Sequence, residues 1–133
     1  MCFIIKASGR KAAPRDRFGY KIVWASDRRN TSCTSPAMTR YPDRATVYAE
    51  KAVTSFRRYE FIRKVGRGSE AGIYVWLLNK WQLQKLKDYV RPGRVVIRVK
   101  LDPKEFIARG RTINTVGEVR VATYKSVYVE GPA

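Results

Sequence analysis

Alternating apolar and polar residues predict that much of this chain forms β-strands. The clearest alternation covers residues 94–101, where an apolar set alternates with a mostly basic one: Val95, Ile97, Val99 and Leu101 against Arg94, Val96, Arg98 and Lys100. Successive side chains of a strand point to opposite faces, so this pattern predicts one apolar face and one basic face. Further strands are predicted at residues 2–7, 18–25, 59–65, 73–77 and 118–129.

Two stretches have apolar residues at helical spacing. The first predicts a helix over residues 44–56, capped by Asp43, and the second predicts a helix over residues 79–90, capped by Asn79 and stopped by Pro92. Strands separated by few helical segments are typical of an α+β fold. We therefore expect a single small domain, with a mostly antiparallel sheet and one or two helices packed on one face.

The length of the chain limits how many hydrophobic cores it can build. With 133 residues, of which 44% are hydrophobic, one packed core is expected, so residues 1–133 are predicted to form one domain. Residues 26–42 are rich in Ser, Thr, Asn, Arg and Pro and are predicted to be an irregular basic loop. Loops of that length are often functional. A second loop is predicted at residues 110–117.

The charge changes the picture most. The chain has 28 Lys and Arg residues against 11 Asp and Glu, a net charge of +17, and it has no histidine. The missing histidine excludes His-based triads, His-containing metal sites and histidine pH switches. A surplus of cations favours a polyanionic partner, with nucleic acid as the first candidate, an acidic protein surface as the second and anionic lipid as the third.

The basic side of the strand at residues 94–101 is the main candidate site. We expect Arg94, Arg98 and Lys100 to lie beside Arg120 on neighbouring strands, on the face of the sheet away from the helices. Tyr124, and Tyr128 if no bulge intervenes, share the parity of Arg120. Cations can neutralise phosphates and flat rings can stack on bases, so this face is predicted to bind nucleic acid. The alternative is a solvated face whose charges prevent edge aggregation.

Basic loops form a second candidate set. They combine arginine, whose guanidinium fits phosphate geometry, with residues typical of turns: Arg28, Arg29, Arg63, Lys64 and Arg67. The alternative for each pair is ordinary solvated charge.

Two enzymatic alternatives remain open from the sequence. Removal of Met1 would expose Cys2 as an N-terminal nucleophile, and Ser32 with Glu118 weakly resembles the pattern of ADP-ribosyltransferases. Two cysteines without histidine do not complete a zinc site, so no cofactor or metal is expected. No run approaches the roughly 18 apolar residues of a membrane span, and no export signal is evident, so we expect no membrane partner and a cytoplasmic location.

The C-terminal half resembles a class of small proteins. The resemblance rests on the order of Gly-Ile-Tyr-Val-Trp from Gly72, a helix, a strand leading into Asp102-Pro103, and Glu-Val-Arg-Val-Ala-Thr-Tyr from Glu118. This order is similar to small accessory proteins of bacteriophages and mobile elements. It implies a phage or mobile-element origin, residence in the host cytoplasm, and inhibition of a host nucleic-acid machine such as a CRISPR effector. It implies no catalytic residue.

These observations together predict a non-catalytic, strongly basic binding protein. Its expected partner is DNA, RNA or a host nucleoprotein complex, which it would inhibit. The alternative is an inhibitor that binds an acidic host protein directly, and the third reading is one of the two enzymes above. The sequence leaves the oligomeric state open.

Overall fold

The computed structural model describes residues 4–5, 12–26, 29–30, 48–55, 72–114 and 116–133. Nine strands form one sheet in the order β1-β7-β8-β5-β2-β6-β9-β4, with β3 paired to β2. Every strand pair is antiparallel. The strands are β1 (Ile4–Ile5), β2 (Phe18–Ser26), β3 (Arg29–Asn30), β4 (Ala52–Ser55), β5 (Ile73–Leu77), β6 (Arg94–Lys100), β7 (Phe106–Asn114), β8 (Gly117–Tyr124) and β9 (Ser126–Pro132).

One α-helix, α1 (Lys80–Tyr89), is present in the described part of the chain, and a short 3₁₀ helix, η5 (Pro103–Glu105), follows β6. Asn79 caps α1: its Oδ1 accepts from the Gln82 amide at 2.8 Å, and the Gln82 Oε1 accepts from the Asn79 amide at 3.1 Å. This reciprocal pair satisfies two amide groups that a helix start leaves without partners. The helix predicted over residues 79–90 is therefore confirmed. The antiparallel sheet with this helix also confirms the prediction of a small, mostly antiparallel α+β domain.

The helix predicted over residues 44–56 is wrong in its C-terminal part. Residues 52–55 form β4, with Ala52 opposite Val129 and Thr54 opposite Val127 of β9. The β-branched residues in this stretch suit a pleated strand, and pairing with a partner far along the chain outweighs the local helical spacing. Residues 110–114, predicted as a loop, belong to β7, which pairs along its length with β8.

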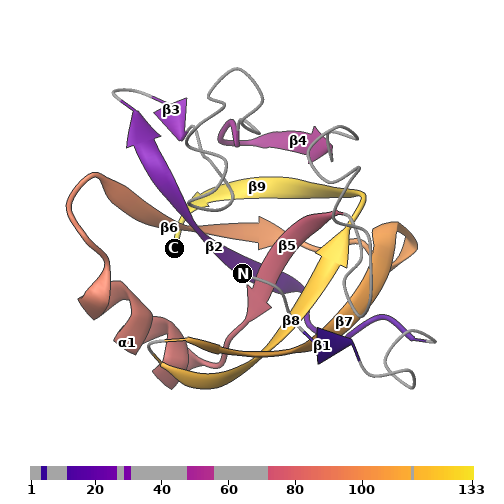
Figure 1. Cartoon of the computed structure of the whole chain (residues 1–133). Helices are drawn as coiled ribbons and strands as arrows, with labels where there is room; N and C mark the ends of the chain where they lie inside the picture. Colours follow the sequence, from indigo (N-terminus) through magenta and orange to yellow (C-terminus); the bar gives the residue numbers. More distant parts are fainter. Residues whose placement is uncertain (1–3, 6–11, 27–28, 31–47, 56–71, 115) are drawn as a thin grey trace.

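Apolar residues line both faces of the sheet and build two clusters. The first cluster gathers the side chains opposite α1: Val23, Tyr48, Ile73, Val75, Leu77, Ile97, Val99, Leu101, Ala122, Tyr124, Val127 and Val129. In the second cluster, Leu86 and Leu83 of α1 pack against Val96, Val119 and Val121 of the sheet. Figure 1 shows α1 at one corner of the sheet and β4 at the opposite side, so the helix covers only part of its face.

Lys21 departs from the pattern expected of β2. It lies on the same side of the strand as Val23, and its side chain is buried at 5% exposure. Its Nζ donates to the backbone carbonyl oxygen of Tyr74 and lies 5.5 and 5.8 Å from the ring centroids of Tyr48 and Tyr74. A carbonyl oxygen and two ring faces replace part of the water that a buried ammonium loses.

Candidate functional site

Two exposed cations of β6 lie beside partly exposed aromatic rings of the neighbouring strands β2 and β9. Arg98 and Lys100 are exposed at the end of β6. Lys100 lies opposite Phe18 of β2 and Tyr128 of β9, and Tyr128 lies opposite Val53 of β4. Residues directly opposite one another in antiparallel strands share a face. We call this row the cation–aromatic stripe, and it consists of Phe18, Arg98, Lys100, Tyr128 and Val53.

The stripe lies on the side of the sheet that also carries α1. Alternate residues of β6 point to the same face, so Val96 lies on the face of Arg94, Arg98 and Lys100. Val96 is buried in the cluster beneath α1. The prediction that these three basic residues face away from the helices is therefore wrong. Figure 1 shows the arrowhead end of β6 running away from α1, and the last residues of the strand, Arg98 and Lys100, are exposed on the helix side.

Arg98 is held in place by an aromatic neighbour. Its guanidinium carbon lies 4.6 Å from the centroid of the Phe18 ring. Such a stack limits the rotamers of the arginine and leaves the edge of the guanidinium, with its N–H donors, available. Arg98 and Lys100 are two residues apart on one strand, which separates their Cα atoms by about 6.7 Å. That separation is close to the distance between successive phosphates of an extended nucleic-acid strand.

An open depression of about 660 Å³ adjoins the stripe. Lys100, Tyr128 and Val53 line it on the stripe side, and Asp102 and Glu130 add two carboxylates. Its remaining walls come from Leu101, Pro103, Ser126 and Val127. The depression thus combines a flat ring, an ammonium group, two carboxylates and a hydroxyl within one small surface.

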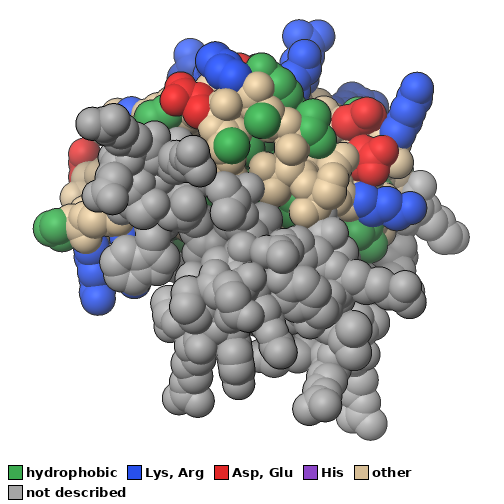
Figure 2. Space-filling view, turned by 90° about the horizontal axis from the view of Figure 1, so that it is seen from above, with side chains coloured by type: hydrophobic (Ala, Val, Ile, Leu, Met, Phe, Trp, Pro, Cys, Tyr) green, Lys and Arg blue, Asp and Glu red, His purple; other side chains and the backbone are tan. Residues whose placement is uncertain are grey.

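Charge on the described surface is mixed in sign. In the coloured part of Figure 2, red acidic side chains stand beside blue basic ones, with green apolar and tan neutral groups between them. Three ion pairs join described residues: Lys51 with Glu130 at 3.9 Å, Arg111 with Glu118 at 3.1 Å, and Arg120 with Asp16 at 2.9 Å. None of them uses Arg98 or Lys100, so these two cations keep their charge uncompensated by any ion pair within the described residues.

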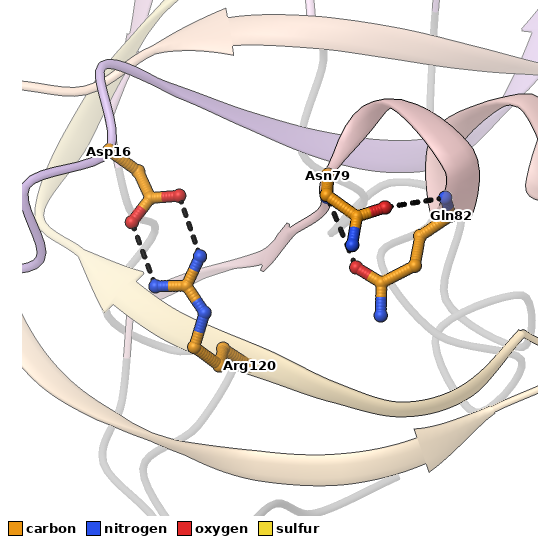
Figure 3. A network of polar contacts seen from close by, with 4 residues as sticks. All are labelled: Asp16, Asn79, Gln82 and Arg120. Atoms are coloured by element: carbon orange, nitrogen blue, oxygen red, sulfur yellow. Dashed lines mark hydrogen bonds and ion pairs between the residues drawn. The ribbon is translucent and has the colours of Figure 1, made fainter.

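Arg120 lies apart from the stripe, which corrects its predicted place beside Arg98. It is opposite Leu77 of β5 and shares the face of the sheet that carries Ala122. Its guanidinium forms two hydrogen bonds to the Asp16 carboxylate, both at 2.9 Å, as Figure 3 shows. The hydrogen bonds to Asp16 raise the pKa of Arg120 above its usual value. Arg120 is therefore committed to an internal partner.

The two tyrosines predicted to join Arg120 lie on different faces. Tyr124 is 1% exposed, with its ring edge-on to Phe106 at 5.8 Å, so it cannot stack on a ligand and the prediction for it is wrong. Burial raises the pKa of Tyr124 to about 12. Tyr128 is half-buried on the stripe face, because β8 ends at Tyr124 and β9 begins at Ser126. On one continuous strand, Tyr124 and Tyr128 would point to the same face. The break at Lys125 places them on opposite faces.

Two further predicted residues, Arg94 and Arg29, do not join the stripe. Arg94 is half-buried at the start of β6, opposite Trp24, and Arg29 lies in β3 opposite Ser26. Four predicted basic residues lie outside the described residues: Arg28, Arg63, Lys64 and Arg67.

For the enzymatic alternatives, Cys2 and Ser32 lie outside the described residues. Glu118 is exposed on β8 and is bound to Arg111. Within the part of the chain that the structure describes, no group of three or more His, Cys, Asp or Glu residues is placed to hold a metal ion.

The outer side of α1 is a second surface that the sequence analysis did not identify. Trp81 is 64% exposed and Tyr89 is 62% exposed, and the Lys85 Nζ lies 4.8 Å from the Trp81 ring centroid. The three residues follow one another at a spacing of four, so they form a row along the helix. The signal was present in the sequence, because a helix that buries Leu83 and Leu86 must turn Trp81 outward.

No helix in the described ranges is long and apolar enough to cross a membrane. Compared with models of known protein families, with curated proteins and with solved structures, the chain matches none of them.

Proposed function

We propose that this protein binds a single strand of nucleic acid, DNA or RNA, through the cation–aromatic stripe, and that it does so without catalysis. The observation that carries the proposal is the arrangement of Arg98, stacked on Phe18, beside Lys100 and Tyr128 on one face of the sheet. Arg98 and Lys100 would each contact a phosphate, and the Tyr128 ring and the guanidinium plane of Arg98 would stack on bases.

The shape of the site favours a single strand over a duplex. The stripe is a sheet surface with rings beside cations, and stacking on such rings requires bases that are not already stacked in a duplex. The helix α1 is not part of this site. It packs its apolar side into the core, and its outer row is aromatic and basic. The net charge of +17 supports the encounter with any polyanion at long range.

Fluorescence anisotropy with labelled single-stranded DNA and RNA of about 16 nucleotides tests the proposal. We expect the double variant Arg98→Ala/Lys100→Ala to bind much more weakly than the wild type. The matched control is Lys87→Ala/Arg111→Ala, which removes the same charge from α1 and β7. Equal weakening in both double variants would show that net charge, and not the stripe, governs binding.

The proposed biological role extends the resemblance of the C-terminal half to phage and mobile-element proteins. A protein of that kind that occupies a nucleic-acid strand can block a host nucleoprotein complex, such as a CRISPR effector, in the host cytoplasm. This role predicts that added protein inhibits such a complex in a reconstituted reaction, and that Arg98→Ala/Lys100→Ala relieves the inhibition.

The row on α1 favours a second candidate function, which is direct binding to an acidic host protein. Exposed Trp and Tyr side chains are frequent energetic centres of protein interfaces, and Lys85 would complement acidic groups on the partner. An acidic protein that is captured after nuclease treatment, and released by Trp81→Ala but not by Arg98→Ala, would support this function. Loss of capture on nuclease treatment would contradict it.

A further inference from the structure

The depression beside the stripe contains groups that a phosphate site does not need. Asp102 and Glu130 line the same hollow as Lys100 and Tyr128. A carboxylate repels phosphate, so two of them next to a phosphate-binding lysine weaken a purely electrostatic site. They suit a ligand that presents N–H donors beside a flat ring, because an ionised carboxylate accepts hydrogen bonds through both oxygens.

Local structure holds both carboxylates at the hollow. Asp102 caps η5, and its Oδ1 accepts from the Lys104 amide at 2.9 Å, which fixes the side chain and uses one oxygen. Glu130 lies at an irregularity between β6 and β9: Arg98 is opposite Gly131, whereas Val99 is opposite Val129. Glu130 is therefore the extra residue on its strand, and bulges of this kind re-aim a side chain.

Glu130 has the better geometry for binding a ligand. Its side chain is 24% exposed, and its ion pair with Lys51 is long, at 3.9 Å. A charge-assisted hydrogen bond is typically about 2.7–2.9 Å, so the contact with Lys51 is much looser than a direct one. Tyr128, two residues earlier in β9, and Val53, which is 65% exposed, supply an apolar wall beside it.

We infer that the depression takes one base of the bound strand and that the Glu130 carboxylate selects guanine. The inference rests on the proposed function. The pairing edge of guanine presents two adjacent donors, N1–H and the 2-amino group, which match the two oxygens of one carboxylate. Adenine and cytosine present one amino group next to an acceptor nitrogen, and thymine and uracil present one N–H between two carbonyl oxygens that the carboxylate repels. The ring of the selected base stacks on Tyr128.

The test compares strands that differ in one base. Thymine oligonucleotides carry a single central guanine, adenine, cytosine or inosine, and anisotropy gives the affinity of each for the wild-type protein. We expect guanine to bind about tenfold tighter than thymine, since one good base-edge contact supplies about that discrimination. Inosine keeps N1–H but lacks the 2-amino group, and we expect it to lose most of the preference. This arm needs no protein variant.

The variant Glu130→Gln tests whether the guanine preference depends on the Glu130 carboxylate. Glutamine keeps the shape but offers one acceptor oxygen, so we expect the guanine preference to disappear while the all-thymine strand binds at least as well. Glu118→Gln is the matched control: it removes the same charge from an exposed carboxylate on β8 and should leave the preference intact.

The possible failures are distinguishable. If all strands bind equally, or inosine binds like guanine, the inference is overturned and the proposed function stands. If the guanine preference survives Glu130→Gln, the assignment to Glu130 is overturned. If no strand binds, the proposed function itself is overturned.

Discussion

Replacing Arg98 by alanine probes the stripe through the salt dependence of binding. Each phosphate neutralised on a single strand contributes about −0.7 to the slope of log K against log salt. If Arg98 and Lys100 each neutralise one phosphate, the stripe contributes about −1.4 to this slope. That contribution corresponds to an about sevenfold loss of affinity between 50 and 200 mM salt. Without Arg98, the stripe contributes only about a 2.6-fold loss of affinity over the same salt range.

The assay is a series of anisotropy titrations across that salt range with a single-stranded oligonucleotide. The side chain of Arg98 is exposed, and loss of its stack on Phe18 removes about 0.5–1 kcal/mol of stability, so the variant stays folded. Arg111→Ala is the control, because Arg111 is exposed on β7 and paired with Glu118. A slope that falls equally in both variants, or that stays unchanged in Arg98→Ala, refutes the placement of phosphates on the stripe.

Four further predictions concern the stripe and the surrounding fold. Tyr128→Ala should weaken single-strand binding by about 1–3 kcal/mol through lost stacking, measured by the same titration. Arg120→Ala should leave binding unchanged, because its guanidinium is held by Asp16; a clear loss of affinity would argue against the assigned faces. Asn79→Ala should lower the free energy of unfolding by about 1 kcal/mol in urea titrations through the lost helix cap. The folded pKa of Tyr124, about 12, lies above its unfolded value near 10, so its contribution is intact below pH 10 and is lost as the pH rises towards 12. The contribution of Tyr124 to the free energy of unfolding should fall by about 2 kcal/mol between pH 10 and pH 12, and Tyr124→Phe should lack this part of the decline.

Local patterns were sufficient to predict the elements whose stability is largely local. The period of two in β6 and the cap and stop of α1 depend on neighbouring residues, and the structure contains both elements where the sequence places them. The exposure of Arg98 and Lys100 follows from the same alternation. Their face could not be predicted, because it depends on where α1 crosses the sheet.

The errors share a physical cause, which is pairing over long distances in sequence. Arg120 is engaged by Asp16, which is 104 residues away along the chain, so no local pattern indicates that the cation is already used. Residues 52–55 have helical spacing but gain a full strand partner in β9. For Tyr128, β8 pairs with β5 and β7 whereas β9 pairs with β6 and β4, and the one-residue break between them at Lys125 inverts the face. In each case tertiary pairing outweighs local preference.

In the proposed complex, the nucleic-acid strand lies on the cation–aromatic stripe. Amide and aromatic chemical-shift changes of isotope-labelled protein, followed by NMR as a short single strand is added, test it most directly. We expect the largest changes at Phe18, Arg98, Lys100 and Tyr128, and we expect them to weaken as salt is added. Changes centred on Trp81 and Tyr89 of α1, or spread evenly over the exposed lysines and arginines, would contradict it.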